Sequence, residues 1–196
     1  MPLSSSVSRT LRHTRAIQVQ AFARDDGLWD LDAQITDIKT SDIRLASGPR
    51  GAGVPVHDLK LRLTINHDML IVDAEAASDT VPYPGYCDTI APAYKSLIGL
   101  SLTDHFRLRL KDRLAGVLGC THLTELSLIL PTAAIQAFAN DVVPSRGGEA
   151  LDLAHAEAAS NERPFMINRC HALRADGPAV AKYYPRWAAK PVIRQD

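Results

Sequence analysis

The chain has 196 residues, of which 46% are hydrophobic, and its 22 lysines and arginines balance 22 aspartates and glutamates. A chain of this length can bury the core of one domain. Its zero net charge argues against binding to nucleic acid or to an anionic membrane surface, because no net field would attract either. No apolar run approaches the roughly 20 residues of a membrane-spanning helix. No signal-peptide pattern opens the sequence, and we therefore expect a cytoplasmic protein without a membrane partner.

The sequence contains three cysteines, Cys87, Cys120 and Cys170. Three thiols cannot all pair within one chain, and the cytoplasm would keep them reduced. We therefore expect free thiols or metal ligands. The simpler alternative for each is a small buried hydrophobic residue.

The first half of the chain predicts a sheet. Residues 1–14 form a polar arm without a core pattern, and hydrophobic and polar residues then alternate through 16–24, 28–38, 56–65 and 69–77. This period predicts four half-buried strands in an antiparallel meander. By the same alternation His57 and Asp37 face inward, and a buried carboxylate requires a partner, so we expect a salt bridge at Asp37. The glycine- and proline-rich residues 41–55 predict a loop.

Helical spacing follows the strands. Apolar residues three and four positions apart predict one short helix near Ile90, a second capped by Thr103 and Asp104, and a third beginning near Cys120. The fold class that we expect is α+β, a four-stranded meander with about three helices packed on one face. We interpret residues 1–196 as one domain with the polar arm, a core at 15–140 and an extended tail at 141–196 that packs back on the core.

The stretch 116–126, GVLGCTHLTEL, concentrates reactive side chains at a helix start. The unpaired amides and the dipole of a helix N-terminus favour the thiolate form of Cys120. His122 and Glu125 are three residues apart and share one helical face, as metal ligands on helices often do. The competing interpretation is a helix cap, in which Thr121 or Cys120 is the N-cap, Glu125 bonds back to the first amides, and His122 is exposed.

Two further donors strengthen the case for a site. Cys87 also lies where sheet leads into helix, and His57 is on the inward face of a neighbouring strand. Cysteine and histidine are the usual zinc and iron ligands, and we predict Cys87, Cys120 and His122 as metal ligands for zinc or iron. A metal-free acid-base site and plain core packing remain alternatives, since the spacing matches no standard zinc motif. The glycine-rich motifs for nucleotides are missing, so we expect no nucleotide cofactor.

Several segments carry a resemblance to a known family. They are GVPVHDLKLRL, which contains His57, PYPGYC ending at Cys87, LIGL, GCTHLTEL, CHAL beginning at Cys170, and YPRW. Together they resemble the bacterial domain-of-unknown-function family 2889. In order of elements the chain is also similar, more distantly, to U-type iron–sulfur scaffold and E-type sulfur-acceptor proteins, which implies that Cys87 and Cys120 lie close together.

From these residues we predict an enzyme, a lyase that acts on a small apolar or aromatic molecule by acid-base chemistry, with or without a metal. The catalytic residues would be His57, Glu125 and Tyr83, and Tyr86, Cys170 and His171 would bind the substrate. The expected partners are this small molecule and a second copy of the chain. The alternatives are a sulfur or iron–sulfur carrier that uses Cys87 and Cys120, and a non-catalytic binding module.

Overall fold

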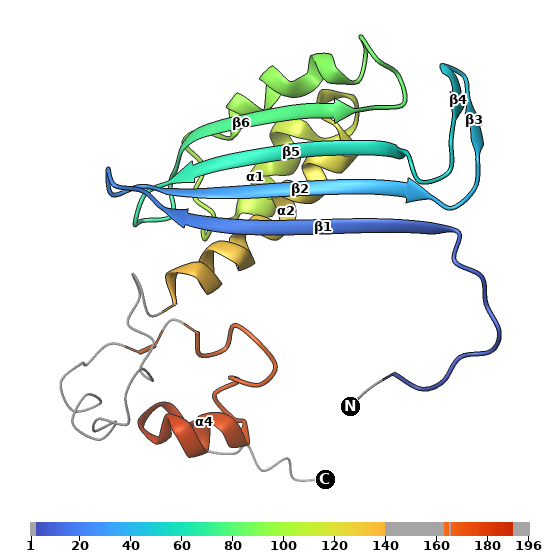
Figure 1. Ribbon diagram of the computed structural model, residues 1–196. Coiled ribbons are helices and arrows are strands. Elements are labelled where there is room, and N and C mark those ends of the chain that lie inside the picture. The colour runs from blue at the N-terminus through green and yellow to red at the C-terminus, as the bar shows by residue number, and fades with distance from the viewer. Residues whose placement is uncertain (1–2, 140–162, 165, 190–196) are drawn as a thin grey trace. The chain divides into compact units, whose positions relative to one another are not determined.

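The computed structural model describes residues 3–139, 163–164 and 166–189 (Figure 1). The chain divides into two compact units, Met1–Pro144 and Ser145–Asp196. The expected packing of the tail on the core stays a prediction.

The first unit is built on a four-stranded antiparallel sheet in the order β1-β2-β5-β6 (Figure 1). Its strands are β1 (His13–Ala23), β2 (Trp29–Lys39), β5 (Pro55–Ile65) and β6 (Ile71–Thr80). Alternate residues of β2 are buried, from Trp29 to Asp37, as the period of two predicts. The predicted meander is confirmed.

The segment that we predicted as a loop contains a small hairpin. Strands β3 (Ile43–Leu45) and β4 (Gly48–Arg50) pair with each other in a separate two-stranded sheet. Gly48 has a φ of 128° at this turn, which a residue with a side chain rarely adopts. Strands of three residues are too short to show an alternating pattern, so composition alone indicated a loop.

Helices cover one face of the sheet (Figure 1). They are the 3₁₀ helix η1 (Asp88–Leu97), α1 (Phe106–Leu114), the short 3₁₀ helix η2 (Gly116–Leu118) and α2 (Thr121–Phe138). Their buried side chains meet those of the sheet in one hydrophobic core, in which Trp29 of β2 packs against Phe138 of α2 with ring centroids 5.0 Å apart. The predicted α+β class, with about three helices on one face, is confirmed.

One predicted helix start differs from the structure. The N-cap residue of α1 is His105, in the left-handed conformation with a φ of 48° and without a side-chain capping bond. Asp104 pairs with Arg109 instead, at 2.6 Å, and Thr103 bonds to Ser101. The prediction that Thr103 and Asp104 cap this helix was therefore wrong, because a salt bridge and a local turn engage both side chains. The α2 start at Cys120 agrees with the prediction.

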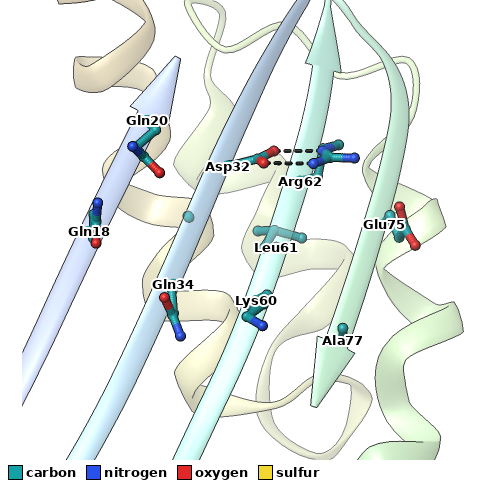
Figure 2. A pocket seen from close by; sticks show the side chains of 10 residues that line it. Gln18, Gln20, Asp32, Gln34, Lys60, Leu61, Arg62, Glu75 and Ala77 are labelled. Atoms are coloured by element: carbon teal, nitrogen blue, oxygen red, sulfur yellow. Dashed lines mark hydrogen bonds and ion pairs between the residues drawn. The ribbon is translucent and has the colours of Figure 1, made fainter. Parts of the chain in front are cut away.

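The other face of the sheet is polar (Figure 2). Charged and amide side chains from all four strands line a shallow depression of about 350 Å³ there. Arg62 on β5 donates to Asp32 on β2 at 2.6 and 2.7 Å, and Gln34 donates to Asp58 at 2.7 Å. Because such cross-strand pairs satisfy one another and water reaches them, we interpret this face as a solvated surface.

The second unit contains α4 (Pro178–Tyr183) and the 3₁₀ helix η3 (Pro185–Trp187). Val180 of α4 is buried. The backbone of Asn168 adopts a φ of 66°, and its side chain accepts a bond from the Ala175 amide at 2.7 Å. Across the described ranges, no helix has both the length and the apolar character needed to cross a membrane.

Candidate active site

A pocket of about 430 Å³ opens between the sheet and the starts of two helices. Its walls come from the first half of β5, from the segment 81–90 that leads into η1, and from the start of α2. A pocket of this size suits a small organic molecule. Within the described part of the chain, its lining contains no lysine, arginine, aspartate or glutamate and consists of His57, Leu59, Val81, Pro82, Tyr83, Tyr86, Cys87, Thr89, Ile90, Gly119, Cys120, Thr121 and His122.

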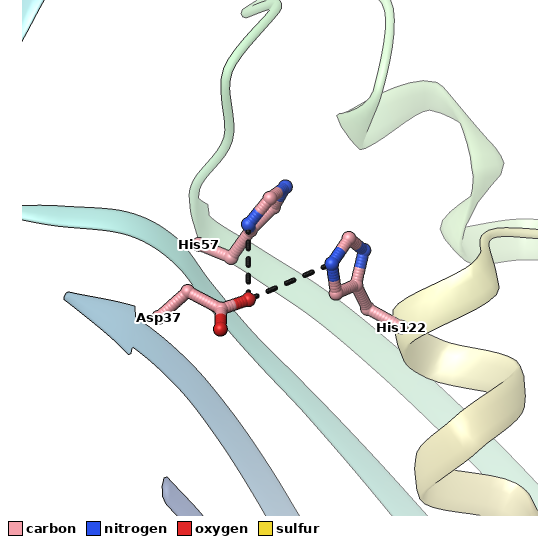
Figure 3. Close-up of side chains that lie close together, drawn as sticks. All are labelled: Asp37, His57 and His122. Atoms are coloured by element: carbon pink, nitrogen blue, oxygen red, sulfur yellow. Dashed lines mark ion pairs between the residues drawn. The ribbon is translucent and has the colours of Figure 1, made fainter. Parts of the chain in front are cut away.

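Two imidazoles and one carboxylate meet at this pocket (Figure 3). Asp37 and His57 are register partners on β2 and β5, so their side chains leave the sheet on the same face. His122 comes from the first turn of α2. Oδ2 of Asp37 lies 3.2 Å from Nδ1 of His57 and 3.5 Å from Nε2 of His122. We call Asp37, His57 and His122 the carboxylate–imidazole cluster.

Two residues of strand β1, His13 and Arg15, also hold the Asp37 carboxylate. The side chain of Asp37 is only 5% exposed, and it accepts two hydrogen bonds from Arg15, both at 2.9 Å, and one from His13 at 2.8 Å. Burial alone would raise the pKa of Asp37, but the bonds from Arg15 and then His13 outweigh burial and lower the pKa to about 2. The salt bridge that we expected at Asp37 is present, and the carboxylate is ionised at neutral pH.

The two imidazoles of the cluster stack, with ring centroids 3.9 Å apart and planes tilted by 33°. Burial, and then the neighbouring ring of His122, lower the pKa of His57, and Asp37 opposes this only in part. These effects favour the neutral form of His57. Its Nδ1 atom is buried and makes no hydrogen bond to any residue that the structure describes, although Asp37 is close.

Cys120 is the N-cap residue of α2 and lines the same pocket. Its Sγ lies 3.9 Å from Nδ1 of His122. Burial would raise the pKa of the thiol, but the bond with His122 and those from the first amides of α2 outweigh burial and lower it. The lowered pKa agrees with the effect that we expected at a helix start. Cys87 lines the pocket as well.

Two features fix the start of α2 and hence the positions of Cys120 and His122. A Cβ on Gly119 would lie 2.4 Å from the carbonyl oxygen of Leu114, so only glycine fits at this close approach. The hydroxyl of the buried Tyr94 accepts a bond from the Cys120 amide at 3.1 Å, and the Cys120 carbonyl and Thr124 Oγ1 lie within 2.9 and 3.0 Å of it. Tyr94 therefore ties η1 to the start of α2.

Tyr94→Phe should lower the free energy of unfolding by about 1–3 kcal/mol, because the change leaves buried polar groups of Cys120 without a partner. Urea unfolding measures this loss. Tyr86→Phe is the matched control, since Tyr86 is 81% exposed, and we expect it to change stability by less than about 0.5 kcal/mol. A loss for Tyr94→Phe no larger than that of the control would contradict the anchoring role.

The structure brings together most of the residues that the sequence predicted. His57, Tyr83, Tyr86, Cys87, Cys120 and His122 line one pocket. Glu125 lies outside that lining and pairs with Arg15 at 2.7 Å, with 42% of its side chain exposed. The helix-cap interpretation of Glu125 does not describe this ion pair.

Cys170 and His171, which we predicted as substrate-binding residues, are exposed and belong to the second unit, whereas the pocket lining comes from the first. Asp37 was expected only to form a salt bridge, and sequence reasoning did not place it in a functional site. The signal was available, since a carboxylate on the inward face of a strand is costly unless it has partners.

The fold and site define a small α+β protein with a carboxylate–imidazole cluster at the edge of a largely apolar pocket. A family model described as a protein of unknown function (DUF2889) matches residues 13–136, and the chain belongs to this family. The matched region contains all three residues of the cluster. No curated protein and no solved structure matches the chain. The likeness to iron–sulfur scaffold and sulfur-acceptor proteins stays a prediction.

Proposed function

We propose that the chain is an enzyme, a lyase that acts on a small apolar or aromatic molecule at the carboxylate–imidazole cluster. The observation that carries this proposal is the position of the cluster. Two stacked imidazoles line a pocket whose other walls are mainly apolar or aromatic, and the ionised carboxylate of Asp37 lies beside both imidazoles. Perturbed titratable groups in an apolar pocket are typical of reaction centres.

The pocket lining limits the substrate class. Among the residues that the structure describes, no lysine or arginine lines the pocket, so its wall offers no cationic side chain to pair with a carboxylate or phosphate. The aromatic rings of Tyr83 and Tyr86 suit stacking against an aromatic or flat apolar group. We therefore propose a neutral substrate with a carbonyl or hydroxyl that the cluster polarises. The cluster accepts a proton from the carbon next to a substrate carbonyl, the hydroxyl on the following carbon takes a proton from Tyr83 and leaves as water, and a C=C bond forms.

The residues take different roles in this proposal. His57 lies within the cluster and in the pocket wall, and we propose it as a catalytic residue, with Tyr83 as the proton donor to the leaving group. Glu125, predicted as catalytic, contacts Arg15, which in turn holds Asp37, so we propose a positioning role for it. The exposed location of Cys170 and His171 in the second unit gives their substrate-binding role no further support.

The test is a panel of neutral aryl β-hydroxy ketones, because loss of water would conjugate the new C=C bond to the carbonyl and raise the near-ultraviolet absorbance. We expect turnover with at least one member, and His57→Ala should lower kcat/KM at least about 100-fold. The control is His105→Asn, a change at an exposed histidine in the left-handed conformation that asparagine tolerates. Equal kinetics for His57→Ala and wild type, or no turnover and no thermal shift with any member, would overturn the proposal.

A second candidate is a sulfur or iron–sulfur carrier. The observation that favours it is the shared pocket of Cys87 and Cys120, together with the lowered pKa of Cys120. Anaerobic reconstitution with iron and sulfide, and incubation with a cysteine desulfurase, test this candidate. Protein that stays colourless and takes up no persulfide on Cys120 would remove it.

The remaining expectations concern assembly and location. The outer edge of β1 is unpaired within the described sheet, and Ile17 on this strand is 38% exposed, which supports the proposal of a homodimer. Light scattering on the purified protein would decide the subunit number. All three cysteines are free, which supports a reducing, cytoplasmic location, and fractionation of cells that produce the protein would test it.

A further inference from the structure

The donor atoms of the carboxylate–imidazole cluster lie close together. In the described part of the chain this cluster is the one group of three histidine, cysteine or acidic side chains whose ligand atoms all lie within 4.8 Å of one another. We infer that Asp37 Oδ2, His57 Nδ1 and His122 Nε2 bind one divalent transition-metal ion, of the zinc and ferrous iron class, with an open coordination position toward the pocket. This inference deepens the proposed function. The metal site itself does not depend on that function, and only the use of the ion in catalysis rests on it.

The spacing of the donors fits such an ion. Zinc lies about 2.0–2.2 Å from nitrogen and oxygen ligands, so two ligands of a tetrahedral site lie about 3.3 Å apart. The two separations from Asp37 Oδ2 are 3.2 Å to His57 and 3.5 Å to His122. The buried Nδ1 of His57 has no hydrogen-bond partner among the described residues, and a metal ion would satisfy this lone pair.

The surrounding groups have the arrangement of an outer shell. A metal-bound histidine usually donates its other ring N–H to a neighbouring acceptor, which fixes the tautomer. Nδ1 of His122 faces Cys120 Sγ at 3.9 Å and Thr121 Oγ1 at 3.5 Å, which leaves Nε2 free to bind the ion. Outer partners also orient the carboxylate, since Arg15 and His13 bond to Asp37. Arg15 donates to one lone pair of Asp37 Oδ2. The second lone pair is available to bind the ion on the side of His57 and His122.

The chemistry of the donors selects the metal class. Two imidazoles and one carboxylate are the ligands of catalytic zinc sites and of non-haem ferrous sites, both of which keep open positions. This set differs from the cysteine-rich set predicted from the sequence. Cys120 contacts the nitrogen of His122 that faces away from Asp37, which places the thiol in the outer shell. A bound ion at the pocket wall would polarise a substrate carbonyl or hydroxyl.

The test is titration of chelator-treated, full-length protein with Co²⁺, followed by visible and near-ultraviolet absorption. We expect one Co²⁺ per chain, with d–d bands and without the intense band of thiolate-to-cobalt charge transfer. His57→Ala and His122→Ala should each weaken binding at least about 100-fold, which exceeds the effect of losing an outer partner. The two histidines lie on different elements, so misfolding of one variant, checked by circular dichroism, leaves the other informative.

Two controls separate the possible ligand sets. Cys120→Ser should retain Co²⁺ binding within about 10-fold, and His105→Asn should bind like wild type. An intense thiolate band that Cys120→Ser abolishes, or equal binding by wild type and both histidine variants, would overturn the inference. Co²⁺ binding without turnover of any substrate leaves the metal site in place and removes the proposed function. Full turnover by metal-free protein keeps the proposed function and removes the catalytic role of the ion, whereas failure of the wild-type protein to bind Co²⁺ removes the metal site.

Discussion

Arg15→Met should lower the free energy of unfolding of the metal-free protein by about 2–3 kcal/mol at pH 7. Removal of one partner from a buried ion pair typically costs about 3–5 kcal/mol, because a buried charge is left without compensation. We expect a loss at or just below the lower end of this range because Arg15 is 35% exposed while Asp37 is only 5% exposed, so water can enter and partly solvate the carboxylate.

The control uses the other carboxylate that Arg15 contacts. Glu125→Gln removes the exposed ion pair with the same guanidinium, and such pairs contribute less than about 1 kcal/mol. In a double-mutant cycle, Asp37→Asn should cost much less in the Arg15→Met background than in wild type. Equal losses for Arg15→Met and Glu125→Gln would contradict the view that Arg15 acts mainly on Asp37.

The difference in unfolding free energy between wild type and Arg15→Met should decrease at low pH. The folded-state pKa of Asp37, about 2, lies below its ordinary value of about 3.9. A group with a depressed pKa contributes stability above the unfolded-state value and loses it as the pH falls through the folded-state value. The stability gap between wild type and Arg15→Met should therefore persist down to about pH 4 and shrink toward pH 2.

Leu126→Ala should lower the free energy of unfolding by about 3–4 kcal/mol. The Leu126 side chain is fully buried in the core that joins α2 to the sheet, so truncation removes its contacts and leaves a cavity. Urea unfolding can be followed by the fluorescence of Trp29, which packs on Phe138 of the same helix. A Trp187→Phe background removes the second tryptophan, which belongs to the other unit.

The matched control is Leu108→Ala, a change in a neighbouring helix at a leucine that is 60% exposed. We expect it to change stability by less than about 0.5 kcal/mol. Because α2 carries Cys120 and His122, Leu126→Ala should also weaken Co²⁺ binding if α2 loosens on the sheet. A loss for Leu126→Ala as small as that for Leu108→Ala would contradict the assignment of α2 to the core.

Much of the site could be predicted from local patterns. The alternation along β5 placed His57 on the inward face, and the glycine before Cys120 indicated the start of a helix. Patterns of this kind determine which way a side chain points, since strand and helix periods are fixed by the backbone. The strands β3 and β4 have only three residues each, which is too short for such a pattern to reveal them. Local patterns also did not distinguish the cap at His105 from the predicted cap at Asp104.

The sequence by itself determined the order of the strands and helices, the inward position of Asp37 and His57, and the reactive character of Cys120 at a helix start. The tertiary structure decided which of these side chains meet. Asp37 and His122 are 85 positions apart in the chain, and only the packing of α2 on the sheet brings them within 3.5 Å. A local pattern indicates which way a side chain points, but the packing of α2 on the sheet depends on contacts between segments far apart in the chain, and the local pattern does not specify which residues meet.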